Sequence, residues 1–290
     1  MKTKFNIYEA ITEKIVAQME KGIIPWQRPW SGGNAEAINY VTRKPYSFIN
    51  QMLLGKTGEW LTFKQIKERG GSIKKGAESR FVVFYSTYNG NSKNEEEVEE
   101  EQGKDIRFIL RYYHVFHIDD CTGIESKIKE VEPANDLQPV ERAEEVIKGY
   151  LAAEPSLHFH NDKASNEAFY RPSTDTVVVP MMSQYEIVEE YYSTAFHELT
   201  HSTMTEDRCN RKSDNKVAAF GSKDYSREEL VAEMGAAMLV NVCGMDCAKA
   251  FENSVAYLQG WLKHLKNDPR AIVWASARAE KAARYIQGER

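Results

Sequence analysis

The sequence predicts an α+β protein of two domains. Strand-like runs dominate its first half and helical periodicity its second half, and a segment bounded by prolines separates the two. A chain of 290 residues is also long enough for more than one domain. We therefore expect an N-terminal α+β domain over residues 1–130, a linker over 131–139 and a C-terminal domain over 140–290.

The composition indicates a cytoplasmic protein that does not span a membrane. No run of about 18 apolar residues is present. The first residues lack the apolar core of a signal peptide. Four cysteines in a chain of this length are too few for a disulfide framework, so we expect free thiols.

The N-terminal half alternates short helices with strands. Apolar residues at helical spacing predict a helix over 7–21, which Gly22 ends. The remaining expected elements are a proline-rich segment at 24–30, a short helix over 59–67, a turn at 70–76 and strands at 80–85 and 106–118. Residues 91–104 carry six Glu and two Lys, a self-repelling run that we expect to be a disordered insertion.

The C-terminal half begins with a helix and three short strands and continues as helices. The strands are expected at 157–159, 168–170 and 176–179, and the last of them could pair with an extended peptide. The helices are expected at 140–152, at about 188–204, at 226–242, at 247–265 and at 269–287, with a polar loop over 207–223.

The pattern His-Glu-x-x-His occurs at residues 197–201. Residues four apart lie on one face of a helix, so His197 and His201 can reach a single ion. Glu198 can take a proton from the water that such an ion activates. The apolar residues of this segment form a stripe centred on the opposite side of the helix. Two surface histidines on an ordinary helix would show the same five residues, and the opposed stripe favours the metal site.

A catalytic zinc usually takes three protein ligands, and two residues compete for the third place. Glu229 lies on the next helix, and Glu233 one turn later could hold a ligating histidine. Asp207 follows His201 by six residues but would need a tight turn, so we favour Glu229. Ser226 and Glu229 also match a capping box, which would give Glu229 a structural role instead.

The first third of the chain is basic although the whole protein carries a net charge of −5. Residues 1–90 hold 14 Lys and Arg against 7 Glu and no Asp, which suggests a polyanionic partner. Aromatic side chains that stack on bases, interleaved with cations, suit single-stranded DNA. The candidate DNA-binding residues are Trp26, Arg28, Trp30, Arg43, Lys44, Tyr46, Asn50, Trp60, Lys64, Lys74 and Lys75.

These motifs together resemble the ArdC-type antirestriction proteins. The resemblance in the C-terminal half rests on residues 197–201, 221–225 and 228–233, and in the N-terminal third on 25–30, 46–50, 60–65 and 74–76. It implies a single-stranded-DNA-binding domain followed by a zincin-like metallopeptidase domain, in proteins that shield plasmid or mobile-element DNA from restriction. One departure is visible, since residues 202–204 are Ser-Thr-Met where the family usually has Trp-Thr-Gly.

The implied mechanism is zinc-assisted hydrolysis of an amide bond in a protein or peptide substrate. Glu198 would act as the base, and Tyr225 could stabilise the oxyanion, although a core tyrosine would look the same. Manganese could replace zinc in such a ligand set. Two alternatives stay open: a DNA-binding protective protein whose metal site is structural or vestigial, and a peptidase whose N-terminal domain binds protein. The oligomeric state is left open.

Overall fold

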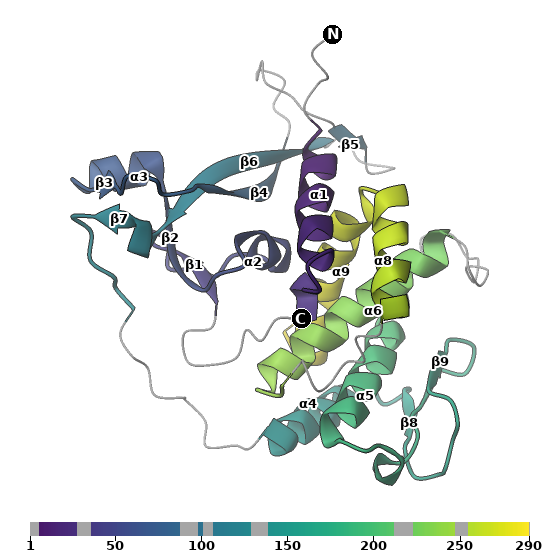
Figure 1. Cartoon of the computed structure of the whole chain (residues 1–290). Coiled ribbons are helices and arrows are strands. Elements are labelled where there is room, and N and C mark those ends of the chain that lie inside the picture. The colour runs from purple at the N-terminus through teal and green to yellow at the C-terminus, as the bar shows by residue number, and fades with distance from the viewer. Residues whose placement is uncertain are drawn as a thin grey trace. The chain divides into compact units, whose positions relative to one another are not determined.

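The chain folds into two compact units in a computed structural model (Figure 1). One unit comprises residues 1–17 and 34–131, and the other comprises 18–33 and 132–290, so helix α1 (Ile7–Met19) has residues in both. The structure describes residues 6–27, 36–87, 98–100, 107–128, 139–211, 223–246 and 255–289. Within these ranges, no helix combines the length and the apolar character that crossing a bilayer requires.

The first unit is built on a mixed sheet whose strands are ordered β1-β2-β6-β4 (Figure 1). Strands β1 and β2 are parallel, and the other neighbours are antiparallel. The bounds are β1 Ala37–Asn39, β2 Gly58–Thr62, β4 Arg80–Thr87 and β6 Arg107–His117. A second, two-stranded sheet joins β3 (Ser72–Ile73) to β7 (Cys121–Thr122), which follows the short helix η2 (Ile118–Asp120).

The expected helix over 59–67 is wrong in its first half. Residues 58–62 form the strand β2, and helix α3 (Phe63–Glu68) begins only after it. The reason is a capping box: the Thr62 hydroxyl accepts from the backbone N–H of Gln65, and the Gln65 side chain accepts from the backbone N–H of Thr62. That pair fixes the helix start at Phe63 and leaves Trp60 and Leu61 in the sheet, where both are buried.

Helix α2 (Phe48–Leu54) packs against the edge strand β4. Its Asn50 is fully buried, and its side-chain amide bonds both the carbonyl and the N–H of Val83 at 2.8 and 2.7 Å. The amide therefore imitates a neighbouring strand and satisfies one stretch of a sheet edge. This structural role accounts for Asn50 without any DNA contact.

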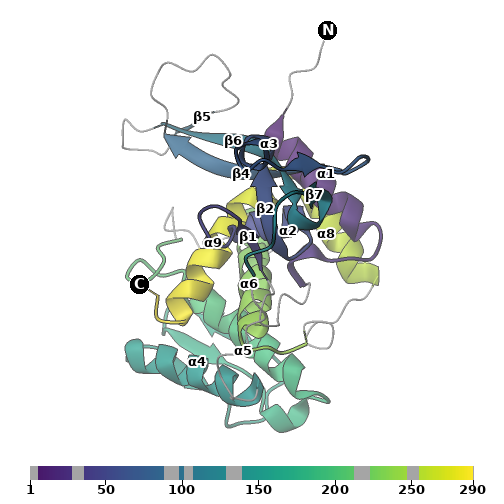
Figure 2. The same cartoon turned by 90° about the vertical axis from the view of Figure 1, so that its left-hand side faces the viewer.

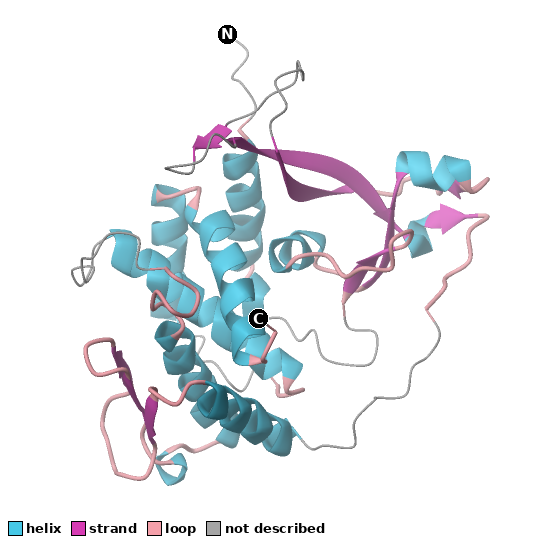
Figure 3. Ribbon diagram, turned by 180° about the vertical axis from the view of Figure 1, so that it is seen from behind, coloured by secondary structure: helices cyan, strands magenta, loops and turns pink. Residues whose placement is uncertain are grey.

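The second unit is mainly helical (Figure 3). Its described helices are η1 (Pro25–Gln27), α4 (Pro139–Ala153), η3 (Met182–Gln184), α5 (Val188–Ser202), α6 (Lys223–Val242), α8 (Val255–Asn267) and α9 (Ala271–Ile286). The core contains the apolar faces of α4, α5, α6 and α9, which bury residues such as Tyr150, Tyr192, Leu239 and Ala283. Apolar residues at helical spacing thus produced a helical layer, as the sequence predicted.

Three short strands lie beside α5 in the order β8-β10-β9. Their bounds are β8 His158–His160, β9 Phe169–Arg171 and β10 Thr176–Val178. Strand β10 is the middle strand, parallel to β8 and antiparallel to β9. Both of its edges are already paired, so the expectation that residues 176–179 would take up a peptide is wrong.

Helices α5 and α6 pack closely together (Figure 2). At Gly235 of α6, a Cβ atom would lie 2.6 Å from Cγ2 of Thr200 on α5. Such a distance would force a neighbouring atom to shift, so a glycine at this position suits the close packing of the two helices. The packing brings the first turns of α6 toward the histidines of α5.

Some expectations fall on residues that the structure does not describe. Of the Glu-rich insertion over 91–104, only 98–100 are described, and they form strand β5 (Val98–Glu100), antiparallel to β6. Disorder is therefore the wrong expectation for those three residues. Residues 131–138 of the expected linker and 247–254 of an expected helix lie outside the described ranges. Cys121, Cys209 and Cys243 are buried free thiols, as expected.

Candidate metal centre

Helix α5 presents its two histidines on the side opposite its buried stripe. The stripe is fully buried in the core of the second unit and comprises Tyr191, Tyr192, Ala195, Phe196 and Leu199. His197 and His201 lie one helical turn apart, with their ring centroids 4.8 Å from each other. The apolar stripe therefore holds the helix in place while both imidazoles face away from the core, as the sequence pattern predicted.

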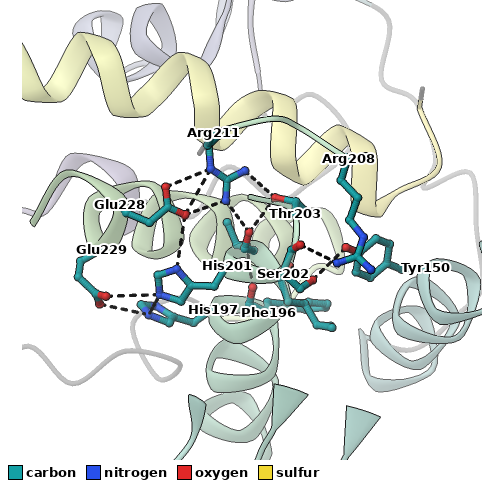
Figure 4. Close-up of polar contacts among 12 residues, drawn as sticks. Tyr150, Phe196, His197, His201, Ser202, Thr203, Arg208, Arg211, Glu228 and Glu229 are labelled. Carbon is teal, nitrogen blue, oxygen red and sulfur yellow. Dashed lines mark hydrogen bonds and ion pairs between the residues drawn. The ribbon is translucent and has the colours of Figure 1, made fainter. Parts of the chain in front are cut away.

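The two imidazoles and one carboxylate from α6 converge on one point. The Nε2 atoms of His197 and His201 are 3.1 Å apart. The Glu229 oxygens lie 3.6 Å from Nε2 of His197 and 3.5 Å from Nε2 of His201 (Figure 4). Among the described residues, these three form a group whose ligand atoms lie within 4.8 Å of one another.

The spacing of these donors fits a tetrahedral divalent metal. Ligand bonds of about 2.0–2.2 Å at a tetrahedral centre place neighbouring donor atoms roughly 3.3–3.6 Å apart. The three observed separations lie within a few tenths of an ångström of that range. Two imidazoles and a carboxylate are also the donor types that zinc takes in catalytic sites with three protein ligands.

The charges around His197 favour a cation at this place. Burial lowers the pKa of His197, but the hydrogen bond to Glu229 and the negative charges of Glu233 and Glu198 outweigh it and raise the pKa to about 9. A site that stabilises a proton on an imidazole through carboxylates also stabilises a metal ion that displaces this proton.

Glu198 is buried beside the cage. Burial raises the pKa of its carboxyl group, while the nearby histidines and a hydrogen bond from the backbone N–H of Tyr170 lower it. The net pKa is raised, which makes the carboxylate a stronger base than an exposed one. Tyr170 lies on β9, so an edge strand of the small sheet borders this carboxylate.

Glu228 and Arg211 hold His201 from its other side, a contact that the sequence analysis missed. Nδ1 of His201 lies 3.5 Å from Oε1 of Glu228. Two nitrogens of Arg211 donate hydrogen bonds to the same carboxylate, at 2.8 and 3.1 Å. It also donates to the carbonyl of Thr200 at 2.7 Å and to the hydroxyl of Thr203 at 2.6 Å (Figure 4). A carboxylate on the second nitrogen of a ligand histidine fixes the orientation of its ring.

A second arginine anchors the end of α5. Arg208, whose side chain is only 3% exposed, donates to the carbonyl of Ser202 at 2.7 Å. The same guanidinium bonds both oxygens of Asp175 and one oxygen of Glu154, and the Ser202 hydroxyl bonds the hydroxyl of Tyr150 at 2.9 Å (Figure 4). Basic side chains near the C-terminus of a helix often bond its last carbonyl groups. The two arginines just after α5 were therefore the feature of the sequence that could have predicted these contacts.

The remaining candidates near the cage are placed as follows. Asp207 is exposed on the loop after α5 and does not join the donor group. Glu233 accepts a hydrogen bond from the Tyr257 hydroxyl at 2.8 Å, and its charge helps to raise the pKa of His197. Glu228 lies 3.5 Å from Nδ1 of His201. The capping box proposed for Glu229 does not form at a helix start, because α6 begins at Lys223. Tyr225 lies in α6, but the structure does not describe its side chain.

Four of the candidate DNA-binding residues make contacts within the protein. Trp26 is fully buried in the second unit, in edge-to-face contact with Trp261. Trp60 is buried and donates to the carbonyl of Lys56, and Asn50 bonds β4 as described above. Arg43 forms an ion pair with the fully buried Glu59. Trp26, in the proline-rich segment at 24–27, therefore presents no exposed ring on which a base could stack.

The other candidates are mostly at the surface. Lys44, Lys64, Lys74 and Lys75 are exposed, whereas Tyr46 is buried except for 7% of its surface. Lys64 lies 3.8 Å from Glu68, and Lys74 donates to the carbonyl of Asp119. Arg28 and Trp30 fall outside the described residues. These four exposed lysines are therefore among the cations of the first unit that a phosphate backbone could reach.

Comparison with known proteins identifies both parts of the chain. Residues 5–116 match the N-terminal domain of the anti-restriction factor ArdC, and residues 150–278 match a zincin-like metallopeptidase family. Crystal structures of the antirestriction protein ArdC from plasmid R388, one metal-free and one with Mn(II) bound, are each similar with a TM-score of 0.70 and 28% identity. The similarity covers 98% of both chains.

Curated relatives are also similar along nearly the whole chain. DNA primase TraC of Escherichia coli is 30% identical over 306 aligned residues that include 99% of this chain, and a second TraC of that species is 29% identical. The chain spans only about a fifth and a quarter of the lengths of these two primases. The protein y4eC of Sinorhizobium fredii is 27% identical and is matched over 93% of its length. The chain therefore belongs to the ArdC family, with an ArdC N-terminal domain followed by a zincin-like metallopeptidase domain.

Proposed function

We propose that this protein binds single-stranded DNA with its first unit and hydrolyses peptide bonds at a divalent metal held by its second unit. In the cell, these activities would protect incoming plasmid or mobile-element DNA from host restriction. The observation that carries the proposal is the cage of His197, His201 and Glu229 with the buried Glu198 beside it. The family to which the chain belongs supports the antirestriction role.

His197, His201 and Glu229 would hold the metal, and the chain would supply the base. A divalent metal in this place provides Lewis acidity, which activates water and polarises a carbonyl group. Glu198 would accept a proton from the attacking water and pass it to the leaving amine. Strand β9, which borders Glu198, is the edge along which an extended peptide would pair. Zinc is the metal we propose, and the Mn(II) bound by the R388 protein makes manganese the alternative.

Removal of one imidazole should empty the metal site. The purified protein should contain about one equivalent of zinc or manganese by mass spectrometry, whereas His197→Ala should contain almost none because two donors cannot hold the ion against buffer. His160→Ala changes a histidine on β8 of the same unit and should leave the metal content unchanged. Equal metal content in wild type and His197→Ala would show that the cage does not bind the metal.

The Glu228 carboxylate should contribute to metal affinity without touching the metal. Glu228→Ala removes the partner of His201 Nδ1, and loss of such a partner typically weakens metal binding about 10- to 100-fold. Competition with a chromophoric chelator measures this affinity directly. Glu228→Gln keeps an acceptor oxygen and should lose less, and Glu206→Ala on the exposed loop should lose nothing. An unchanged affinity in Glu228→Ala would exclude the positioning role.

A further inference from the structure

Two exposed aromatic rings contact each other on one face of the sheet of the first unit. Phe84 on β4 is 42% exposed, and Tyr113 on β6 is 47% exposed. Their ring centroids are 5.9 Å apart. Tyr46 extends the pair, since its ring lies 6.2 Å from that of Phe84. We call these three residues the aromatic platform.

Strand register explains why the platform lies on a single face. Tyr113 is paired with Val82 in the antiparallel ladder, and Phe84 is two residues along the same strand. Residues that are directly opposite, or two apart, point to the same side of a sheet. That side carries the core cluster of Trp60, Val82 and Val115, to which Leu54 of α2 contributes. The platform therefore lies next to this buried cluster, on the same face of the sheet.

Positive charges accompany the platform. Lys44 lies in the exposed turn over residues 41–45, immediately before Tyr46. Arg80 is on the same strand face as Phe84 and lies over the ring of Trp60. Positive side chains close to one surface favour an anionic partner. The net charge of the first 90 residues has the same sign.

We infer that the aromatic platform is the surface on which bases of single-stranded DNA stack, with Lys44 and Arg80 of β4 facing the phosphates. This inference rests on the proposed DNA-binding function and names its site. Stacked rings accept any base because each base has a π face, whereas a duplex keeps its bases stacked inside. Large apolar side chains that contact each other in solvent are also a common mark of a binding surface.

The platform shares Tyr46 with the candidates that the sequence suggested, but its two exposed rings are not among them. The described tryptophans of that set, Trp26 and Trp60, are buried. In the sequence, the strands that hold Phe84 and Tyr113 appear as apolar runs. The strand register is needed to show which of their residues share a face. The two rings come from separate strands, so the platform exists only in the folded unit.

The test is the affinity of the full-length protein for a fluorescein-labelled single-stranded oligonucleotide of mixed sequence, measured by anisotropy at several salt concentrations. Phe84→Leu and Tyr113→Leu should each weaken binding roughly tenfold, because base–aromatic stacking carries about 1–3 kcal/mol per base. The slope of log affinity against log salt should not change in these variants, since no phosphate contact is lost. Lys44→Gln should reduce the slope by about 0.7.

Tyr112→Leu is the matched control. Tyr112 is next to Tyr113 in sequence and is 41% exposed, but its partner in the ladder is Val83, so it points to the opposite face. It should bind the oligonucleotide like wild type. Unchanged thermal unfolding of all variants would show that the unit remains folded, as expected for exposed side chains.

The outcomes separate the inference from the function on which it rests. If wild type binds the oligonucleotide and the Phe84→Leu/Tyr113→Leu double variant binds equally well, the platform is not the site. Equal weakening by Tyr112→Leu would also overturn it, because the effect would not then belong to one face. If wild type does not bind the oligonucleotide at low salt, the DNA-binding function fails, and the platform fails with it.

Discussion

Glu198→Gln should keep its metal and lose peptide hydrolysis by about 10²- to 10⁴-fold, the range that general-base catalysis contributes. The change replaces one buried oxygen by a nitrogen of similar size and leaves His197, His201 and Glu229 in place. The neutral amide can still accept from the backbone N–H of Tyr170, but it cannot take a proton from water. The variant should therefore keep the three donor residues in place but lack the group that accepts the proton.

The measurement uses a pool of fluorescence-quenched peptides of mixed sequence, because the substrate of the second unit is unidentified. Glu206→Gln is the same substitution on the exposed loop that follows α5, and it should cleave the pool like wild type. Full turnover in Glu198→Gln would remove Glu198 from the mechanism. A metal-loaded wild type that cleaves no peptide in the pool would favour the alternative in which the metal site is structural or vestigial.

Arg208→Met should destabilise the second unit by about 3–5 kcal/mol, the cost of removing one partner from a buried ion network. The guanidinium is almost completely buried and joins three parts of the unit: it bonds Glu154 just after α4, Asp175 before β10 and the last turn of α5. Methionine fills a similar volume but leaves two carboxylates without their cation. A loss of this size is a large fraction of the stability of an ordinary domain.

Hydrogen exchange of the α5 amides under native conditions measures this effect within the second unit alone. Arg284→Met provides the comparison, because Arg284 forms a surface pair with Glu280 and is 55% exposed. Its removal should cost less than about 1 kcal/mol. Similar protection of the α5 amides in Arg208→Met and wild type would mean that the network adds no stability.

The grouping of the candidate metal ligands could be predicted because their geometry is local. His197 and His201 are related by one helical turn, and this relation holds wherever the helix packs. Glu229 required a choice between two carboxylates, and the helical pattern of the next segment was sufficient for it. Glu228 could not be assigned, because its role depends on where α6 begins and on a guanidinium from the intervening loop.

The proposed nucleic-acid surface could not be predicted for a different reason. Composition identified a basic, aromatic segment but contains no information on which rings are exposed. Trp26 and Trp60 are buried because they fill the cores of two separate units, and Arg43 neutralises a buried Glu59. Phe84 and Tyr113 became neighbours only through the pairing of β4 with β6 across residues 88–106.

The glycine at position 235 affects how the three candidate metal donors come together. The backbone of Gly235 on α6 packs against the Thr200 side chain of α5, and this helix packing holds the two imidazoles and Glu229 near one another. A metal ion would therefore meet three donors that the helix packing has already brought together. A methyl group added at position 235 would press on Thr200 and disturb this arrangement, although it would touch none of the three candidate ligands.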